Sequence, residues 1–232
     1  MNTTLILNFL REVMANNNRP WFQAHRDEYL AAKEDFESGV EKAIPRIVRF
    51  DPSVAHITVK DAVYRFYRDT RFSPDKSPYK NHMGAYIAAH GKKALHGGYS
   101  IHLEPGNCML ACGSYYLPSP ILTACRNEIM ANEEEWLRCV ESPAFLRLFG
   151  RPGVHRFEEE KGFGLESLKT CPAGFPRDYA HIEYLRMKDY CCWVKVDEDF
   201  FSGDEWLDKM AKVFKVAKPM MDFVNAVIDD YE

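Results

Sequence analysis

The chain has 232 residues, 46% of them hydrophobic, which suits one large domain with a sizeable core. Charged residues make up 28%, both signs are interspersed, and the formal net charge is −4. This balance argues against a general nucleic-acid binder, which carries a basic excess over much of its surface. We therefore expect no nucleic-acid partner and look for any basic patch locally.

The N-terminal residues Met1 to Phe9 have no basic region and no long apolar stretch, so they do not resemble a secretory signal. No run approaches the roughly 20 apolar residues that span a bilayer. The seven cysteines are an odd number, which favours free thiols over a disulfide framework. We expect a cytoplasmic protein without a membrane partner.

The first helix is predicted over residues 3–15, where Leu5, Ile6, Phe9, Leu10 and Val13 recur at helical spacing. Asn16 to Asn18 should end it, because asparagine both terminates helices and caps the next one. A second helix is predicted from Pro20 to Val48, with Pro45 as the expected site of a bend.

The middle of the chain predicts a sheet. Strands are expected at Val63 to Arg68, Tyr99 to Leu103, Met109 to Tyr116 and Tyr190 to Val196; residues 83–89 are ambiguous. The turn residues Glu104 to Asn107 should join two of these strands as a hairpin. Helices are expected over 120–149 in two pieces broken near Ser142, over 180–187, and from a Ser202 cap to Tyr231, with Gly150 to Pro176 as a loop. Helices at both ends around a mostly antiparallel sheet predict a single α+β domain spanning residues 1–232.

Standard catalytic signatures are missing: the sequence has no Walker loop, dinucleotide fingerprint or His-Glu-x-x-His zinc helix. The histidines His82, His90, His96 and His102 lack carboxylate partners at helical spacing, so we interpret them as ordinary sheet or surface residues and expect no metal site. The sequence assigns no cofactor and no reaction, and it leaves open whether the chain is an enzyme.

One polar segment stands out. Residues 60–80 contain six cations against three anions, a local excess of +3 in a chain of net charge −4. On a strand, Arg65, Asp69 and Arg71 would point the same way, and Arg68 the other. Two arginines beside one aspartate are a common way to hold a guanidinium rigid for an external anion. The turn residues Ser73 to Lys76 should deliver Lys76, Tyr79 and Lys80 from a constrained loop.

The leading hypothesis is a small-molecule site for a phosphate- or carboxylate-bearing ligand. The alternative is a non-catalytic protein-interaction or scaffold domain, in which Asp69 and Asp75 neutralise the cations in a structural salt-bridge network. A third, weaker hypothesis is single-stranded nucleic-acid binding through Tyr64, Phe66, Tyr67 and the arginines.

Two motifs carry a family resemblance. The first, Asn17-Asn18-Arg19-Pro20-Trp21-Phe22, continues with His25-Arg26 and Tyr29, and the second runs from Arg68 to Lys80 as RDTRFSPDKSPYK. The sequence resembles a family of bacterial and fungal conserved hypothetical proteins, a domain of unknown function. Arg126 and the stretch Gly174 to Asp178 also fit, but Tyr179-Ala180 departs from the expected His-Pro. A histidine that acted as an acid or base there would be missing from this chain.

The resemblance implies one domain and groups the helix around Trp21 with the basic segment. Trp21, His25 and Tyr29 share one helical face at i, i+4 spacing, and Arg26 lies on the adjacent face. Aromatic walls and arginines around one pocket would suit an anionic organic ligand. Trp21 and Phe22 as core anchors are the alternative. The candidate ligand-binding residues are Arg68, Asp69, Arg71, Lys76, Tyr79, Lys80, His25, Arg26 and Trp21.

Overall fold

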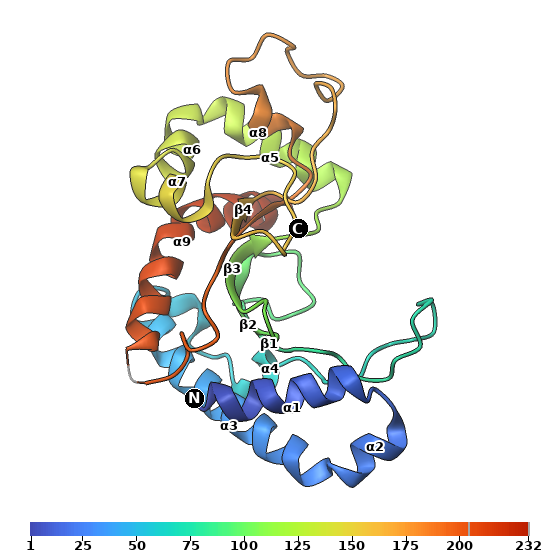
Figure 1. Ribbon diagram of the computed structural model, residues 1–232. Helices are drawn as coiled ribbons and strands as arrows, with labels where there is room; N and C mark the ends of the chain where they lie inside the picture. The colour runs from blue at the N-terminus through green and yellow to red at the C-terminus, as the bar shows by residue number, and fades with distance from the viewer. Residues whose placement is uncertain (204, 232) are drawn as a thin grey trace. The chain divides into compact units, whose positions relative to one another are not determined.

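A computed structural model describes residues 1–203 and 205–231. Its helices are α1 (Thr3–Ala15), α2 (Arg19–Ala24), α3 (Arg26–Val48), η1 (Pro52–Val54), α4 (Val59–Ala62), α5 (Ser119–Ala131), α6 (Glu133–Val140), α7 (Pro143–Phe149), α8 (Ile182–Arg186) and α9 (Trp206–Tyr231) (Figure 1). Its strands are β1 (Met83–Ile87), β2 (Gly98–Leu103), β3 (Met109–Ser114), β4 (Lys161–Phe163) and β5 (Tyr190–Lys195). They form one antiparallel sheet in the order β1-β2-β3-β5-β4. The predicted α+β class is confirmed.

The chain divides into two compact units with interleaved segments. The first unit comprises Met1–Lys92, Ser100–Met109 and Val196–Ala211, and the second comprises Lys93–Tyr99, Leu110–Lys195 and the segment that begins at Lys212. The single domain expected for residues 1–232 stays a prediction.

The N-terminal helices belong to the first unit. Helix α1 has the predicted bounds, is capped by the Asn2 side chain, and packs its buried face, which includes Phe9 and Leu10, against α3. The predicted continuous helix from Pro20 to Val48 is wrong, because the chain leaves helical geometry at His25 (φ −109°, ψ 25°). The His25 ring makes a 2.8 Å hydrogen bond with the carbonyl of Trp21 and stacks on the Trp21 ring at 4.1 Å. Helix α3 continues through Pro45 to Val48.

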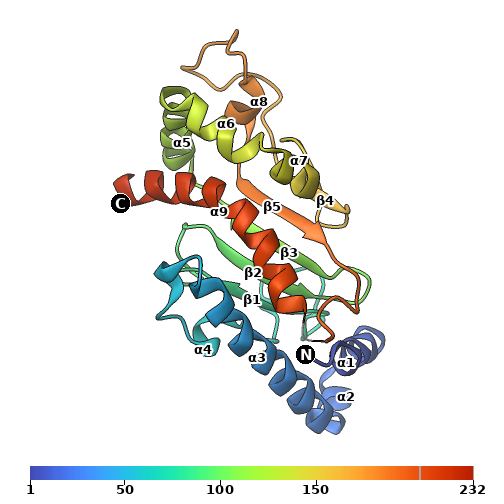
Figure 2. The same ribbon diagram turned by 90° about the vertical axis from the view of Figure 1, so that its left-hand side faces the viewer.

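The segment Val63 to Arg68 was predicted as a strand, and this prediction is wrong. Its residues change partner along the way: Val63 bridges Ala85 of β1, whereas Tyr67 bridges Tyr79. Because residues 63–68 do not stay paired with either segment over several residues, they form isolated bridges and not a continuous strand. The ambiguous stretch 83–89 contains β1, and α3 and α4 both contact this strand (Figure 2).

In the second unit, β3 ends at Ser114 rather than at Tyr116. Gly113 has a φ of 96°, and a Cβ there would lie 2.1 Å from the Tyr190 carbonyl oxygen, so only glycine fits. The predicted helical stretch 120–149 has an additional break at Asn132, where backbone geometry departs from helical between α5 and α6. Helix α7 lies along β4 and β5.

Strand β4 was missed because it lies in the Gly- and Pro-rich stretch that predicted a loop. Its three residues pair antiparallel with β5, and Gly162 faces Trp193 so closely that a Cβ would lie 2.3 Å from the indole ring. Helix α9 begins at Trp206 rather than at Ser202, whose hydroxyl hydrogen-bonds that of Thr3. Trp206, Met210 and Phe214 are buried, and Val213 is only half-buried.

Across residues 1–203 and 205–231, no helix combines the length and the apolar character required to cross a bilayer. The cytoplasmic location stays a prediction.

A backbone clamp joins the first motif to the second. The Asn17 side chain donates to the Tyr79 carbonyl at 3.0 Å and accepts from the Tyr79 N–H at 3.1 Å. Its amide group thus makes the two backbone hydrogen bonds that a neighbouring strand would otherwise make. The Tyr79 ring stacks on that of Phe22 at a centroid distance of 3.9 Å. Asn18 caps α2 by accepting from the Trp21 N–H. The first motif therefore starts a helix and fixes the segment around Tyr79.

Replacement of Asn17 by alanine should lower the free energy of unfolding by ~1–3 kcal/mol, because two part-buried backbone groups of Tyr79 lose their partner. Chemical denaturation measures this loss. Asn16→Ala is the matched control, since the half-buried Asn16 side chain bonds the carbonyl of Glu12 within its own helix turn and, among the described residues, makes no hydrogen bond to Tyr79. Equal midpoints for the two variants would contradict the clamp.

The cysteines are all free, and five of them are buried. Burial raises the pKa of the Cys108 thiol to about 11 and that of Cys125 to about 12, which suppresses their thiolates at neutral pH. We expect a thiol reagent to titrate seven groups in denaturant without reductant, and at most the half-buried Cys139 and Cys171 quickly in the native protein. A stoichiometry of five or fewer after denaturation would reveal a disulfide.

Candidate functional site

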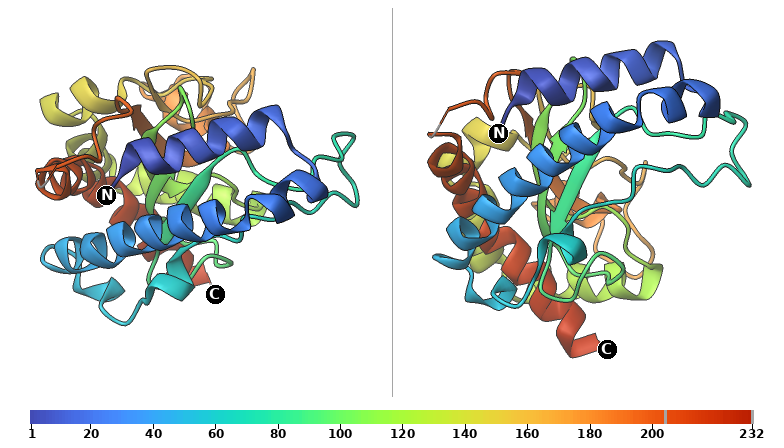
Figure 3. Two further views of the ribbon diagram at one scale, coloured as in Figure 1. Left: turned by 60° about the horizontal axis from the view of Figure 1, so that its bottom comes forward. Right: turned by 90° about the horizontal axis from the view of Figure 1, so that it is seen from below.

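The second motif forms an irregular hairpin in the first unit. Its stem is held by hydrogen bonds from the Arg68 N–H to the Pro78 carbonyl at 2.9 Å and from the Lys80 N–H to the Phe66 carbonyl at 3.0 Å. The hairpin tip, residues 69–77, extends away from α1, α2 and α3 (Figures 1 and 3). The stem thus separates two groups of cations: those on the tip and those at its base.

The cations of the hairpin tip are paired locally. Arg71 binds Asp69 with two side-chain hydrogen bonds of 3.0 and 2.7 Å. Arg68 pairs with Asp75, and the Lys76 ammonium donates to the Thr70 carbonyl at 2.9 Å. The salt-bridge network that was the alternative interpretation therefore describes the tip.

The candidate residues on the N-terminal helices do not meet the tip residues at a cavity. Trp21 is half-buried and stacks on His25, while Arg26 is exposed at the start of α3. Tyr79 is only 3% exposed and belongs to the aromatic core around Phe22. Of the nine candidates, Lys80 alone lines a cleft that the first unit forms between α3, α4 and the entrance to β1.

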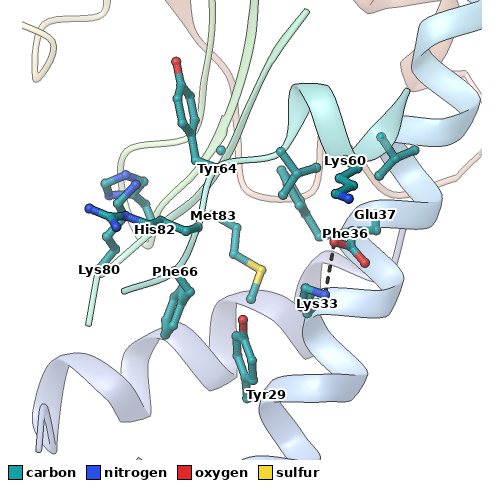
Figure 4. Close-up of a pocket in the computed structure, with 14 residues that line it drawn as sticks. Tyr29, Lys33, Phe36, Glu37, Lys60, Tyr64, Phe66, Lys80, His82 and Met83 are labelled. Carbon is teal, nitrogen blue, oxygen red and sulfur yellow. Dashed lines mark ion pairs between the residues drawn. The ribbon is translucent and has the colours of Figure 1, made fainter. Parts of the chain in front are cut away.

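This cleft has a volume of about 450 Å³. Its walls come from α3, α4, the segment that follows α4, and the residues leading into β1: Tyr29, Lys33, Phe36, Glu37, Val59, Lys60, Val63, Tyr64, Arg65, Phe66, Lys80, His82, Met83 and Gly84. Lys80 and His82 lie on one side and the Lys33–Glu37 ion pair on the other (Figure 4). Four cationic side chains therefore face one carboxylate.

The cleft cations differ from those of the tip in their partners. Lys33 pairs with Glu37 at 3.3 Å. Among the described residues, the side chains of Lys60, Arg65 and Lys80 make no ion pair, and the Lys80 ammonium instead lies 5.1 Å from the centre of the Tyr64 ring. Burial lowers the pKa of Lys80, and the positive charges of Arg65 and Lys92 lower it further. This part of the cleft is electropositive, with a partly desolvated ammonium at Lys80 and exposed cations at Lys60 and Arg65.

An apolar wall completes the cleft. Tyr29 and Phe66 pack together at 5.2 Å, and Figure 4 shows the Tyr29 hydroxyl directed toward Met83. Burial raises the pKa of Tyr29, so its hydroxyl stays protonated and available as a hydrogen-bond donor at neutral pH. A ligand with an anionic end and an apolar body matches these two kinds of wall.

His82 is a cleft residue that sequence reasoning missed. Burial, the neighbouring His102 and the charge of Lys80 lower its pKa to about 4, so the ring is neutral at neutral pH. The sequence signal that could have identified His82 as a site residue was its position two residues after Lys80, directly before β1. Glu37 and His82 are the metal-ligating side chains of the cleft, and Glu37 is held by Lys33, so we assign no metal or cofactor to it.

A scan of protein-family models matches residues 5–223 to a conserved hypothetical protein family, DUF2461. The chain belongs to this family. Neither the curated proteins nor the solved structures include one that matches the chain. Membership therefore agrees with the resemblance of the two motifs and adds no activity.

One further residue of the family resemblance has a structural role in the second unit. The buried Arg126 of α5 donates to the carbonyls of Leu185 at 2.6 Å and Met187 at 3.0 Å. It thereby holds the end of α8, where the backbone leaves the helix and leads toward β5. This clamp explains a buried arginine without invoking a ligand.

The Asp69–Arg71 pair predicts an anomalous titration. Hydrogen bonds from Arg71 lower the pKa of Asp69 from 3.8 to about 2. Because the folded-state pKa is depressed, the pairing contributes fully above about pH 4 and is lost as the pH falls through about 2. Carboxyl NMR should show this midpoint, and Arg71→Gln should return it toward 3.8. Arg26→Gln, at an exposed site on α3, should leave it unchanged; a wild-type midpoint near 3.8 would refute the pairing.

Proposed function

We propose that this protein binds a small anionic molecule, bearing a phosphate or carboxylate group, in the cleft of the first unit. The observation that carries the proposal is the cluster of Lys60, Arg65 and Lys80, which have no carboxylate partner among the described residues. Lys80 is partly desolvated, and an unpaired desolvated cation is costly to a folded protein, whereas a bound anion offsets that cost. The site is therefore centred on the base of the hairpin, and not on its tip.

The dimensions and the lining of the cleft support the same function. A volume of about 450 Å³ lies within the range of roughly 300–1,000 Å³ that is typical of small-molecule sites. Guanidinium and ammonium groups bind phosphate and carboxylate oxygens by charge-assisted hydrogen bonds. The rings of Tyr29, Phe66 and Tyr64 offer apolar and stacking surface for the remainder of the ligand.

A protein-interaction role is a second candidate, and it concerns the hairpin tip. Phe72 is 93% exposed, and the ion pairs Asp69–Arg71 and Arg68–Asp75 flank it. A tip that presents one large apolar side chain would suit a partner protein, because large aromatic residues are enriched in interface hot spots. The two functions use different surfaces of the same unit.

The anion site can be tested with two lysines four positions apart. Lys80→Gln should weaken phosphate binding by about tenfold or more, because it removes a charged hydrogen-bond donor from the cleft. Calorimetric titration measures the affinity, and the phosphate-induced rise in melting temperature gives an independent value by mass action. Chloride at equal ionic strength corrects for general screening.

Lys76→Gln is the matched control. It removes the same charge from the same hairpin, but Lys76 contacts the Thr70 carbonyl at the tip and not the cleft. Phosphate affinity should stay within about twofold of wild type in this variant. Equal losses in both variants would place the anion elsewhere, and no specific binding of any oxyanion to the wild-type protein would refute the proposed function.

A further inference from the structure

The cleft histidine belongs to a hydrogen-bond network organised by Glu104. This carboxylate accepts from His102 Nε2 at 3.0 Å, from Asn107 Nδ2 at 3.0 Å and from Asn81 Nδ2. Burial acts to raise the pKa of Glu104, but the hydrogen bonds from His102 and Asn107 bring it below its ordinary value. Glu104 is therefore ionised at neutral pH and can only accept hydrogen bonds.

The charge of Glu104 fixes the orientation of Asn81. Since an ionised carboxylate only accepts, the NH₂ group of Asn81 must face Glu104, and the amide oxygen then faces His82. This oxygen lies 3.1 Å from His82 Nδ1. An amide oxygen also only accepts, so Nδ1 of the neutral ring must carry the proton. His82 Nε2 is consequently left with a lone pair.

The free side of the His82 ring belongs to the cleft. Nε2 has no hydrogen-bond partner among the described residues, and the ring is part of the cleft wall beside Lys80 (Figure 4). Its Cδ2 atom, which is bonded to Nε2, would lie 4.0 Å from a Cβ placed on Gly84, another wall residue. A neutral hydrogen-bond acceptor is thus placed on the wall of a cleft that also carries the cations Lys60, Arg65 and Lys80.

We infer that the cleft selects oxyanions that carry an O–H group, and that it prefers phosphate or a phosphomonoester monoanion to sulfate. This inference rests on the proposed anion site. Lys60, Arg65 and Lys80 attract any oxyanion, but a fully deprotonated oxygen placed against the Nε2 lone pair is repelled. A P–OH group donates to Nε2 and satisfies it. A carboxylate would fit in the same way if its molecule carried a neighbouring hydroxyl.

Two anions of equal charge can distinguish this mechanism from simple electrostatic attraction. Above the second pKa of phosphate, hydrogen phosphate and sulfate have the same charge and nearly the same shape, and they differ by one O–H group. A pocket that reads only charge binds the two equally. Sites built to hydrogen-bond a hydroxyl reject analogues that lack it, because a polar group is then left unpaired.

The experiment is a calorimetric titration of the whole chain with phosphate and with sulfate at about pH 8 and equal ionic strength. We expect phosphate to bind about tenfold more tightly. Equal affinities, or tighter sulfate binding, would overturn the selectivity while leaving the proposed anion site intact. If neither anion binds, both proposals fail, so the two failures are distinguishable.

Asn81 acts through His82 as a positioning residue, and Asn107 supplies a matched control. Both side chains donate to Glu104, but only Asn81 contacts the His82 ring. Asn81→Ala should free the ring to present an Nε2–H donor and reduce the phosphate-to-sulfate preference to about twofold or less. Asn107→Ala should keep the preference, whatever its cost in stability.

Nitrogen-15 NMR of the imidazoles provides a readout that a purely structural role of Asn81 would not move. The wild-type His82 ring should show a protonated Nδ1 and an unprotonated Nε2 at neutral pH, and Asn81→Ala should shift the tautomer population. An Nε2–H tautomer in the wild-type protein would overturn the inference. A phosphate preference that Asn81→Ala leaves intact would overturn the role of the network.

Discussion

The first unit depends on the two hydrogen bonds between the Asn17 amide and the backbone of Tyr79. They hold a segment that lacks a regular strand on either side, and the ring of Tyr79 adds a stack on Phe22. Because Lys80 follows directly in sequence, the clamp sets where that side chain enters the cleft. The two family motifs, about 50 residues apart, are thus joined by a contact that also positions Lys80 in the proposed anion site.

The cations of the hairpin differ in their partners with their distance from the Asn17–Tyr79 clamp. At the tip, turns bring Asp69 to Arg71 and Asp75 to Arg68 within a few residues of one another. At the base, the chain carries Arg65 and Lys80 but no acidic residue, and the single carboxylate of the cleft is engaged by Lys33. The positive charge that the sequence concentrates in residues 60–80 therefore stays unneutralised at the base of the hairpin, next to the Asn17–Tyr79 hydrogen bonds. At the tip, Asp69 and Asp75 pair with Arg71 and Arg68 across the turns.

Sequence reasoning succeeded where a pattern is local. Helical periodicity defined α1, and turn residues placed the hairpin of β2 and β3. It failed at His25, where a side-chain contact with the Trp21 carbonyl accompanies the interruption of a long helix, and at β4, which exists through its pairing with β5. Residues 63–68 have strand composition, but their two partners lie on different segments. The partners of β4 and of residues 63–68 are not encoded within a short window of sequence.

The candidate site shows the same limit. Composition located the basic segment, but it gave equal weight to Lys76 and Lys80, whose environments differ entirely. His82 looked ordinary because its partner network runs through Asn81 to Glu104, 23 residues away. The charge on Glu104 orients an amide, the amide fixes a tautomer, and the tautomer determines whether a neutral ring donates or accepts. In our proposal the cationic cleft owes its chemical selectivity to this sequence of steps, which starts from a carboxylate that does not line the cleft.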